Sequence, residues 1–309
     1  MALTYKSLDT MKASRDSNSW TNQQKIDHCN AIVQFCPDIT HISMDCFYDL
    51  PIYHSAGYVQ EWCDAIHDTG KKIWFRGVPA WDGLTAAQSI TNISDLISNN
   101  SLWFENGDIF EYCPESHPYI FSDPPDNWNN STVVWSQWHA DMIASADAAF
   151  SGISKSGVIT TIQSITSSYW TQGDVKASAL TAFDNQISID YYPLDLLDPV
   201  KAVKSMMNTL NTLHGTYPTA DIIISEIGVM NTKNPTDTQQ REILRAALNE
   251  LSTLDYITGV SYWVSYNTSG GGGYTQLFQT NSRTVPRPAL KTLSEFFTIG
   301  TCHQRMDVI

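Results

Sequence analysis

The sequence predicts a single (β/α)8 barrel, an α/β fold in which eight parallel strands each lead into a helix. Two observations support this prediction. Apolar, β-branched runs alternate along the chain with segments of helical periodicity, and eight such runs can be counted. The length of 309 residues is ordinary for one closed barrel, and 42% hydrophobic residues are enough for a large core.

The predicted strands follow the rule that a parallel strand buried on both faces is a nearly continuous apolar run. Ile222-Ile223-Ile224, within the predicted strand 221–229, fits this rule best, and residues 3–8 are a weaker candidate for the opening strand. The other predicted strands are residues 41–47, 72–78, 108–113, 158–165, 186–192 and 257–264.

Amphipathic helices are predicted between the strands. Val59, Trp62, Cys63 and Ile66 have the spacing of one helical face, and residues 86–97, 135–142, 203–210 and 244–251 show similar patterns. Residues 171–185 are the least regular of these segments. Because no linker or low-complexity segment interrupts the pattern, we expect residues 1–309 to form one catalytic domain, with a candidate disordered tail at 300–309.

The net charge of -14 disfavours nucleic acid and anionic membranes as partners. No apolar run is long enough to span a bilayer. The first nine residues lack the features of a secretory signal, so a cytoplasmic protein and a secreted one with its signal removed both stay open. No glycine-rich nucleotide motif follows an early strand, so we expect no cofactor; the oligomeric state is not predicted.

In barrels of this kind the active site lies at the carboxyl ends of the strands. Carboxylates, aromatic rings and an arginine gather there in the predicted arrangement. We therefore select as candidate site residues Asp45, Arg76, Trp81, Glu111, Glu115, His117, Tyr192, Glu226 and Trp263.

Glu226 closes the most apolar of the predicted strands, where a charge is costly unless it is paired or functional. We predict a catalytic role for it; the alternative is a carboxylate that caps the next helix or pairs with Arg76. Glu111 and Glu115 lie at the end of the fourth predicted strand. We favour Glu115 as the catalytic acid, because Glu111 lies deeper and is expected to pair with Arg76 or another buried group.

Two carboxylates on facing strands form a glycosidase arrangement: one protonates the leaving oxygen and the other attacks the anomeric carbon. Tyr192 can donate a hydrogen bond to the nucleophile, and Trp263 can lie under the sugar ring. Each role has an equally good alternative. Tyr192 can be an ordinary core aromatic residue, and Trp263 can simply pack at the barrel mouth. The expected substrate is an oligosaccharide or polysaccharide, with Arg76, Glu111, Asp45, His117 and Trp81 as further binding residues.

These motifs resemble the clan A glycoside hydrolases over nearly the whole chain. The segments that carry the resemblance are Ile224-Ser225-Glu226-Ile227-Gly228, Ile189-Asp190-Tyr191-Tyr192-Pro193, Ser261-Tyr262-Trp263 and Pro286-Arg287-Pro288-Ala289-Leu290. The resemblance implies a two-glutamate retaining mechanism on a β-linked glycan, with Glu226 as nucleophile and Glu115 as acid/base. It also implies an Asn before the acid/base, where this chain has Cys113-Pro114.

Two other classes of protein remain as alternatives. A metal-dependent barrel hydrolase needs clustered ligands, and none of the predicted strands carries a His-x-His pair, so no metal is expected. A catalytically inactive carbohydrate-binding barrel is consistent with Pro114 before Glu115. Chelator treatment distinguishes the first, and Glu226→Gln distinguishes the second.

Overall fold

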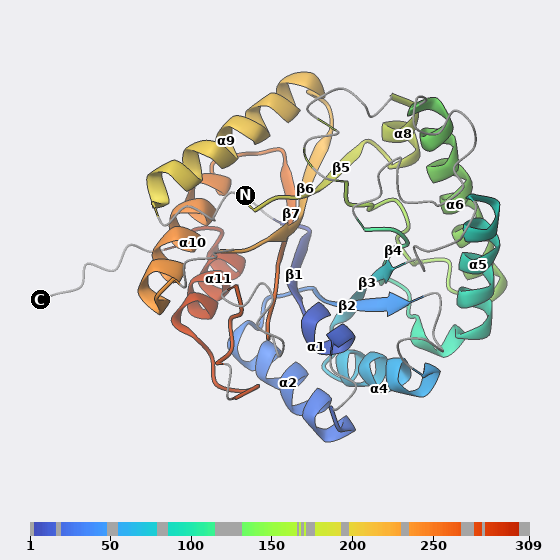
Figure 1. Cartoon of the computed structure of the whole chain (residues 1–309), viewed down its shortest axis with the longest axis horizontal. Helices are drawn as coiled ribbons and strands as arrows, with labels where there is room; N and C mark the ends of the chain where they lie inside the picture. The colour runs from blue at the N-terminus through green and yellow to red at the C-terminus, as the bar shows by residue number, and fades with distance from the viewer. Residues whose placement is uncertain are drawn as a thin grey trace, which may run out of the picture.

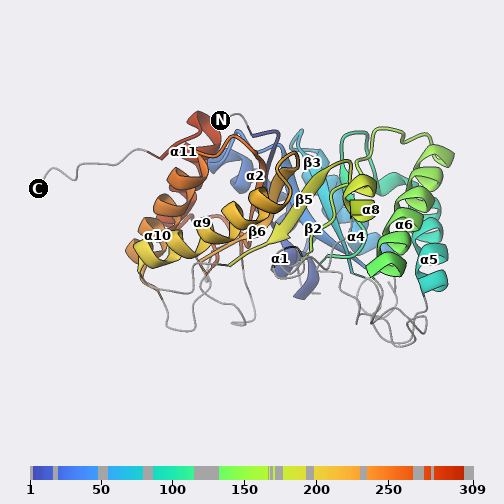
Figure 2. The ribbon, with the colours of Figure 1, turned by 90° about the horizontal axis from the view of Figure 1, so that it is seen from above.

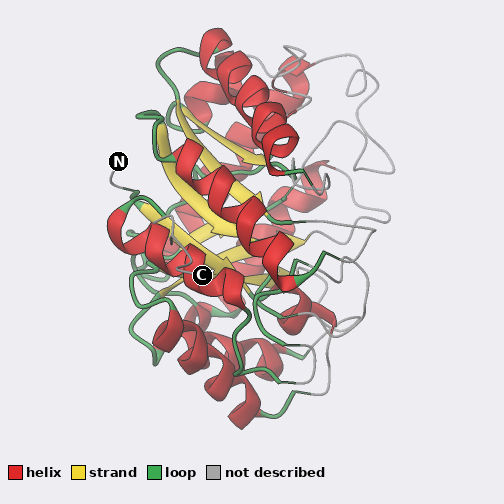
Figure 3. Ribbon diagram, turned by 90° about the vertical axis from the view of Figure 1, so that its left-hand side faces the viewer, coloured by secondary structure: helices red, strands yellow, loops and turns green. Residues whose placement is uncertain are grey.

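In the computed structural model of the chain, helices form an outer ring around an inner ring of strands (Figure 1). The structure describes residues 3–16, 20–47, 55–78, 86–114, 132–165, 167, 170, 177–192, 198–229, 235–266, 275–279 and 282–302. Seen from above and from the side, the strands lie between layers of helices (Figures 2 and 3). The α/β class and the (β/α)8 barrel predicted from the sequence are confirmed.

Within these residues, seven strands form one sheet in the order β4-β3-β2-β1-β7-β6-β5, and each neighbouring pair is parallel. Two strands, β2 and β3, have the bounds that the sequence predicted, whereas the opening strand is shifted toward Asp9. The strands are β1 (Tyr5–Asp9), β2 (His41–Phe47), β3 (Lys72–Val78), β4 (Ile109–Glu111), β5 (Gln186–Asp190), β6 (Asp221–Ile227) and β7 (Ile257–Tyr262).

The predicted strand at 158–165 is not a regular strand, yet this segment connects the two edges of the sheet. Ile159 bridges β4 at Ile109, and Ser164 bridges β5 at Ser188, both in the parallel sense. Between these bridges the Gln163 side chain accepts a hydrogen bond from the backbone N–H of Tyr112 at 3.2 Å and donates one to the carbonyl oxygen of Phe110 at 3.1 Å. A side-chain amide thus replaces part of the backbone hydrogen bonding between strands. The irregular segment 158–165 takes the place of the eighth strand and closes the barrel.

The helices begin where the sequence provides caps. Thr21 and Thr236 each form a capping box with a Gln three residues later, and Asp198 caps a helix whose first residue is Pro199. The described helices are α1 (Met11–Asp16), α2 (Asn22–Phe35), α4 (Ala56–His67), α5 (Ala86–Asn99), α6 (Thr132–Gly152), α8 (Ala177–Ala182), α9 (Pro199–Thr216), α10 (Asp237–Leu251) and α11 (Pro288–Ile299), with a short 3-10 turn η1 (Ser101–Trp103). None of the helices described is long and apolar enough to cross a membrane.

The strands separate two apolar cores. The larger one contains the outward residues of the strands, such as Phe75, Ile222 and Ile224, together with the helix faces. The smaller one contains inward residues, with Trp74, Ile109, Ile162 and Ile223 as its buried members. Because successive side chains on a strand alternate between faces, the residues two positions beyond Trp74 and Ile109 also point into the barrel. Those residues are Arg76 and Glu111.

Candidate active site

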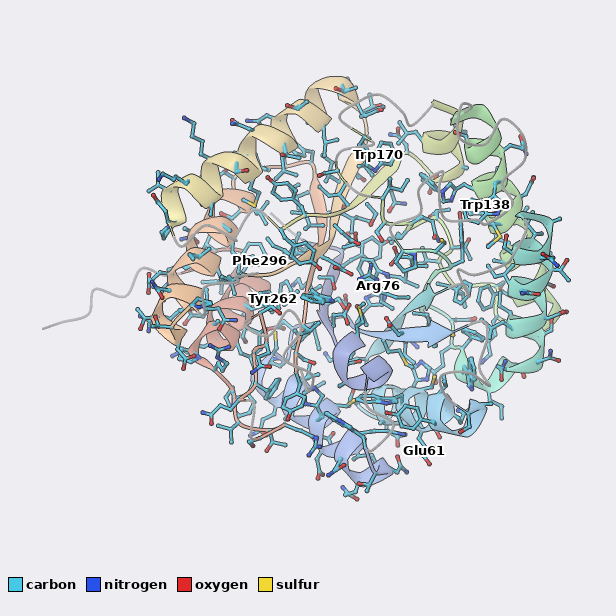
Figure 4. All side chains as sticks on the ribbon, viewed as in Figure 1. Glu61, Arg76, Trp138, Trp170, Tyr262 and Phe296 are labelled. Atoms are coloured by element: carbon cyan, nitrogen blue, oxygen red, sulfur yellow. The ribbon has the colours of Figure 1, made fainter. Side chains whose placement is uncertain are left out.

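Arg76, near the carboxyl end of β3, lies at the centre of the barrel (Figure 4). Its guanidinium forms ion pairs with carboxylates from four other strands. Nε lies 3.1 Å from Glu111 Oε2, one terminal nitrogen lies 3.1 Å from Asp190 Oδ2, and the other lies 3.5 Å from Asp9 Oδ2 and in contact with Glu226 Oε1. We call Asp9, Glu111, Asp190 and Glu226 the carboxylate ring.

Glu111, on β4, is fully buried, and both of its carboxylate oxygens accept hydrogen bonds. Oε2 accepts from Arg76 Nε and from Trp74 Nε1 at 3.2 Å. Oε1 accepts from the backbone N–H of Ser164 at 2.7 Å and from the Ser164 hydroxyl. Burial raises the pKa of Glu111 above its ordinary value, although Arg76 and Ser164 oppose that rise. The predicted pair between Glu111 and Arg76 is therefore present, and both carboxylate oxygens of Glu111 accept hydrogen bonds from the protein.

Glu226, on β6, reaches the ring because the strand departs from regular pairing. Ile222 and Ile224 face the outer core and Ile223 faces the inner one, so strict alternation would point Glu226 outward. The register shifts on both sides, against β5 next to Asp190 and against β7 between Ile224 and Ile227. This irregularity turns the carboxylate of Glu226 inward, onto Arg76.

Gly228 continues this irregular stretch and allows the chain to approach β7 closely. A Cβ atom at this position would lie 2.4 Å from the carbonyl oxygen of Trp263, a distance that real Cβ atoms do not show. The backbone N–H of Trp263 in turn donates to the carbonyl oxygen of Ile227 at 2.9 Å. Glycine is thus required at position 228, because any larger residue there would push the two strand ends apart.

The ring carries more negative charge than Arg76 neutralises. Burial by itself lowers the pKa of the Arg76 guanidinium, but Glu111, Asp190, Asp9 and Asp45 more than offset this and raise it above its ordinary value. Burial also raises the pKa of Asp9, with Arg76 and the backbone N–H of Met11 acting in the opposite direction. Asp45 on β2 is buried close enough to Arg76 to contribute to this balance.

Exposure distinguishes Glu226 from the other members of the ring. Its side chain is 8% exposed, whereas those of Asp9 and Glu111 are 0% exposed and that of Asp190 is 1% exposed. Glu226 is therefore the member of the ring with the best access to a bound molecule. The structure also shows that Glu226 pairs with Arg76, as the alternative interpretation of the sequence stated.

Two aromatic residues flank the carboxyl ends of β5 and β7. The rings of Tyr192 and Trp263 pack edge to face with centroids 5.6 Å apart, and Trp263 is 7% exposed. The expected hydrogen bond from Tyr192 to Glu226 is not among the contacts of the described residues. Roles for both rings in sugar binding stay predictions.

Other predicted site residues lie outside the described part of the chain, namely Trp81, Glu115 and His117. The separation of the Glu115 and Glu226 carboxyl groups is therefore not a structural observation. Conversely, the sequence did not single out Asp9, Ser164 or Ser225. Asp9 was missed because the opening strand was predicted to end one residue earlier, although it shares the inward parity of Ser7 in the barrel. Among the residues described, no group of His, Cys, Asp and Glu side chains fits a metal ion.

A family model described as "Glycosyl hydrolase catalytic core" matches residues 129–291, more than half of the chain. The chain belongs to this family. This result confirms the expected resemblance to clan A glycoside hydrolases. No curated protein matches the sequence at a significant level.

Solved structures with a similar fold include two β-glucuronidases. The enzyme from Dictyoglomus thermophilum is 13% identical with a TM-score of 0.62, and the alignment covers 96% of this chain and 50% of that one. The Ruminococcus gnavus enzyme in complex with D-glucuronic acid is 10% identical with a TM-score of 0.65, covering 96% and 49%. At these identities the likeness shows the fold alone, and this glycosyl hydrolase core spans about half the length of either neighbour.

Proposed function

We propose that this glycosyl hydrolase core is a retaining enzyme that cleaves a β-linked glycan by double displacement. The proposal depends mainly on one observation. An irregular β6 turns Glu226 onto Arg76 at the carboxyl end of a barrel of this family, and leaves it the most exposed carboxylate of the ring. A neighbouring guanidinium stabilises the ionised form of a carboxylate, which is the form that a nucleophile needs.

In the proposed reaction Glu226 attacks the anomeric carbon while the acid/base protonates the oxygen of the leaving group. The bond from the anomeric carbon to that oxygen breaks, and a glycosyl ester of Glu226 forms. Water then attacks the same carbon, the acid/base accepts the proton, and Glu226 is released. Two inversions give net retention of the β configuration.

We assign the acid/base role to Glu115. Supporting this choice, the four hydrogen bonds that Glu111 accepts, from Arg76, Trp74 and Ser164, occupy its oxygens and remove it from solvent. A proton donor must reach the leaving oxygen directly or through one water, so a fully enclosed carboxylate is poorly suited. In this proposal Glu111 holds Arg76, and Trp263 forms the platform under the sugar.

Nucleophile trapping tests the proposal. The protein is first assayed with 4-nitrophenyl β-glucoside, β-galactoside, β-mannoside and β-glucuronide, and then incubated with the 2,4-dinitrophenyl 2-deoxy-2-fluoro form of the best substrate. We expect time-dependent inactivation, with the fluorosugar recovered by mass spectrometry on the peptide that contains Glu226. A label on another acidic residue would overturn the assignment.

The matched variant is Glu226→Gln, which keeps the size of the side chain and removes its charge. We expect turnover to fall by about 10⁴-fold or more, because the residue forms the covalent bond. Glycan binding should persist, since Trp263 and the remaining rim are intact. A protein that shows glycan binding but no turnover in either form is instead an inactive carbohydrate-binding barrel, and loss of turnover on chelation indicates a metal-dependent hydrolase.

A further inference from the structure

We infer that Asp190 is a positioning residue for Glu226, which it controls through Arg76 on one side and Ser225 on the other. The inference depends on the proposed role of Glu226 as nucleophile. No resemblance of the sequence assigned a function to Asp190, and its place in the carboxylate ring comes only from the structure.

The two oxygens of Asp190 serve two different neighbours of Glu226. Oδ2 accepts a hydrogen bond from Arg76 at 3.1 Å, and Arg76 contacts Glu226 through its other terminal nitrogen. Oδ1 accepts from the hydroxyl of Ser225 at 2.7 Å. Ser225 directly precedes Glu226, so one carboxylate holds both the cation that faces the proposed nucleophile and the backbone that carries it.

The backbone contacts around Asp190 act at the same point. The register between β5 and β6 shifts at Ile189 and Asp190, which stand opposite Ile224 and Glu226. The N–H of Tyr191 then donates to the carbonyl oxygen of Glu226 at 3.0 Å. These bonds fix the irregular turn of β6, without which alternation would direct Glu226 away from the barrel interior.

Burial makes this arrangement rigid. The side chains of Asp190 and Arg76 are 1% and 3% exposed, so water cannot replace either partner easily. A salt bridge in such surroundings is costly to break, because a buried charge is left without compensation. Among the described residues, loss of the Asp190 carboxylate therefore leaves that terminal nitrogen of Arg76 with only the Ser164 hydroxyl, at 3.3 Å, and leaves the Ser225 hydroxyl without its acceptor. Small displacements of a nucleophile reduce rates strongly.

The test compares Asp190→Ala, Asp190→Asn and Ser225→Ala with wild type, using the 4-nitrophenyl β-glycoside that wild type hydrolyses best. We expect Asp190→Ala to lower kcat/KM by about 100-fold, mainly through kcat, because a displaced nucleophile affects the transition state more than binding. Asp190→Asn should recover most of this loss, since an amide can accept from Arg76 and donate to Ser225. Ser225→Ala should cost less than Asp190→Ala, because only one of the two contacts is removed.

The pH profile separates positioning from a merely structural role. Among the described residues, Asp9, Asp45, Glu111 and Asp190 act on the Arg76 cation that contacts Glu226. Like charges disfavour ionisation of a neighbouring carboxylate, so Asp190→Asn should move the acidic limb of kcat/KM to lower pH. The control is Asp108→Asn, which alters a buried carboxylate just before β4 that accepts from the backbone N–H groups of Ile73 and Glu105. That variant should lose thermal stability and keep the wild-type pH profile.

The inference is overturned if Asp190→Asn and Asp190→Ala keep the wild-type acidic limb and lose activity only in proportion to their thermal stability. It is equally overturned if both retain wild-type kcat/KM. Should Asp190→Ala fail to fold, Asp190→Asn and Ser225→Ala decide the outcome. Glu226→Gln is measured in parallel. If Glu226→Gln retains turnover, the proposed function itself is wrong. If Glu226→Gln is inactive while the Asp190 variants have wild-type activity, only the role of Asp190 is contradicted.

Discussion

The interior of this barrel changes character within two residues along β3 and β4. Toward the amino ends, Trp74, Ile109 and Ile223 pack into a small apolar core. At the carboxyl ends, Arg76 and Glu111 belong to a buried group in which carboxylates outnumber the cation. Both regions point inward, and within the carboxylate ring Glu226 has the most exposed side chain, at 8%. The apolar core needs no exception to the ordinary rules of packing, whereas the charged group is costly unless its arrangement serves a function.

The largest effect on stability is expected from Arg76→Met. Without the guanidinium, Asp9, Glu111, Asp190 and Glu226 share a buried site to which the described residues bring no other paired cation. We therefore expect a loss of about 3–5 kcal/mol in the free energy of unfolding at pH 7. The loss should shrink as the pH falls, since protonation removes the uncompensated charges. Urea unfolding at several pH values measures it.

The control for that variant is Lys201→Met, which removes an ion pair with Asp198 at the protein surface, where the two side chains are 72% and 45% exposed. A change below about 1 kcal/mol is expected there. If Arg76→Met is no more destabilising than Lys201→Met, the carboxylate ring does not depend on Arg76 for its charge balance.

The apolar region should respond differently. We expect Ile223→Ala to reduce the free energy of unfolding by about 3 kcal/mol, because a cavity remains where a fully buried side chain was removed. This loss should be the same at pH 5 and pH 7. Leu102→Ala is the control, since Leu102 is 80% exposed and its truncation should cost about 0.5 kcal/mol or less. A strong pH dependence for Ile223→Ala would show that the two regions are coupled.

The smallest effect is expected from Asp9→Asn. Because burial raises the pKa of Asp9 in the folded chain, the folded state binds more protons than the unfolded one once the pH exceeds the ordinary range of an aspartate. Ionised Asp9 therefore reduces stability as the pH rises through its folded pKa. Relative to wild type, Asp9→Asn should therefore gain stability as the pH rises from 4 to 7.

The Asn side chain can still accept from the N–H of Met11, as Asp9 Oδ1 does. Any free energy lost because the Asn side chain contacts Arg76 less well is the same at pH 4 and pH 7. It therefore cancels when the stabilities at the two pH values are compared. Asp27→Asn, at an exposed position, should show no such trend. A difference that falls with rising pH would mean that Arg76 outweighs burial at Asp9.

The two regions could be predicted from the sequence to different extents. Periodicity located the inner apolar residues only as members of strands, yet Arg76 and Glu111 were paired correctly because both close apolar runs. Asp9 was missed, since a weak opening strand offers little local signal for where it ends. The assignment of Glu115 as acid/base and the binding roles of Trp81 and His117 stay predictions.

Local patterns in the chain determined the alternation of strands and helices, the family and the choice of Glu226, because apolar periodicity and short motifs are properties of neighbouring residues. Only the tertiary structure decided how the barrel closes and where Glu226 points. Gln163 joins β4 to an irregular segment, and paired register shifts turn Glu226 toward Arg76. Both features depend on contacts between strands far apart in the chain, and a strict two-residue alternation would have predicted the opposite face for the carboxylate.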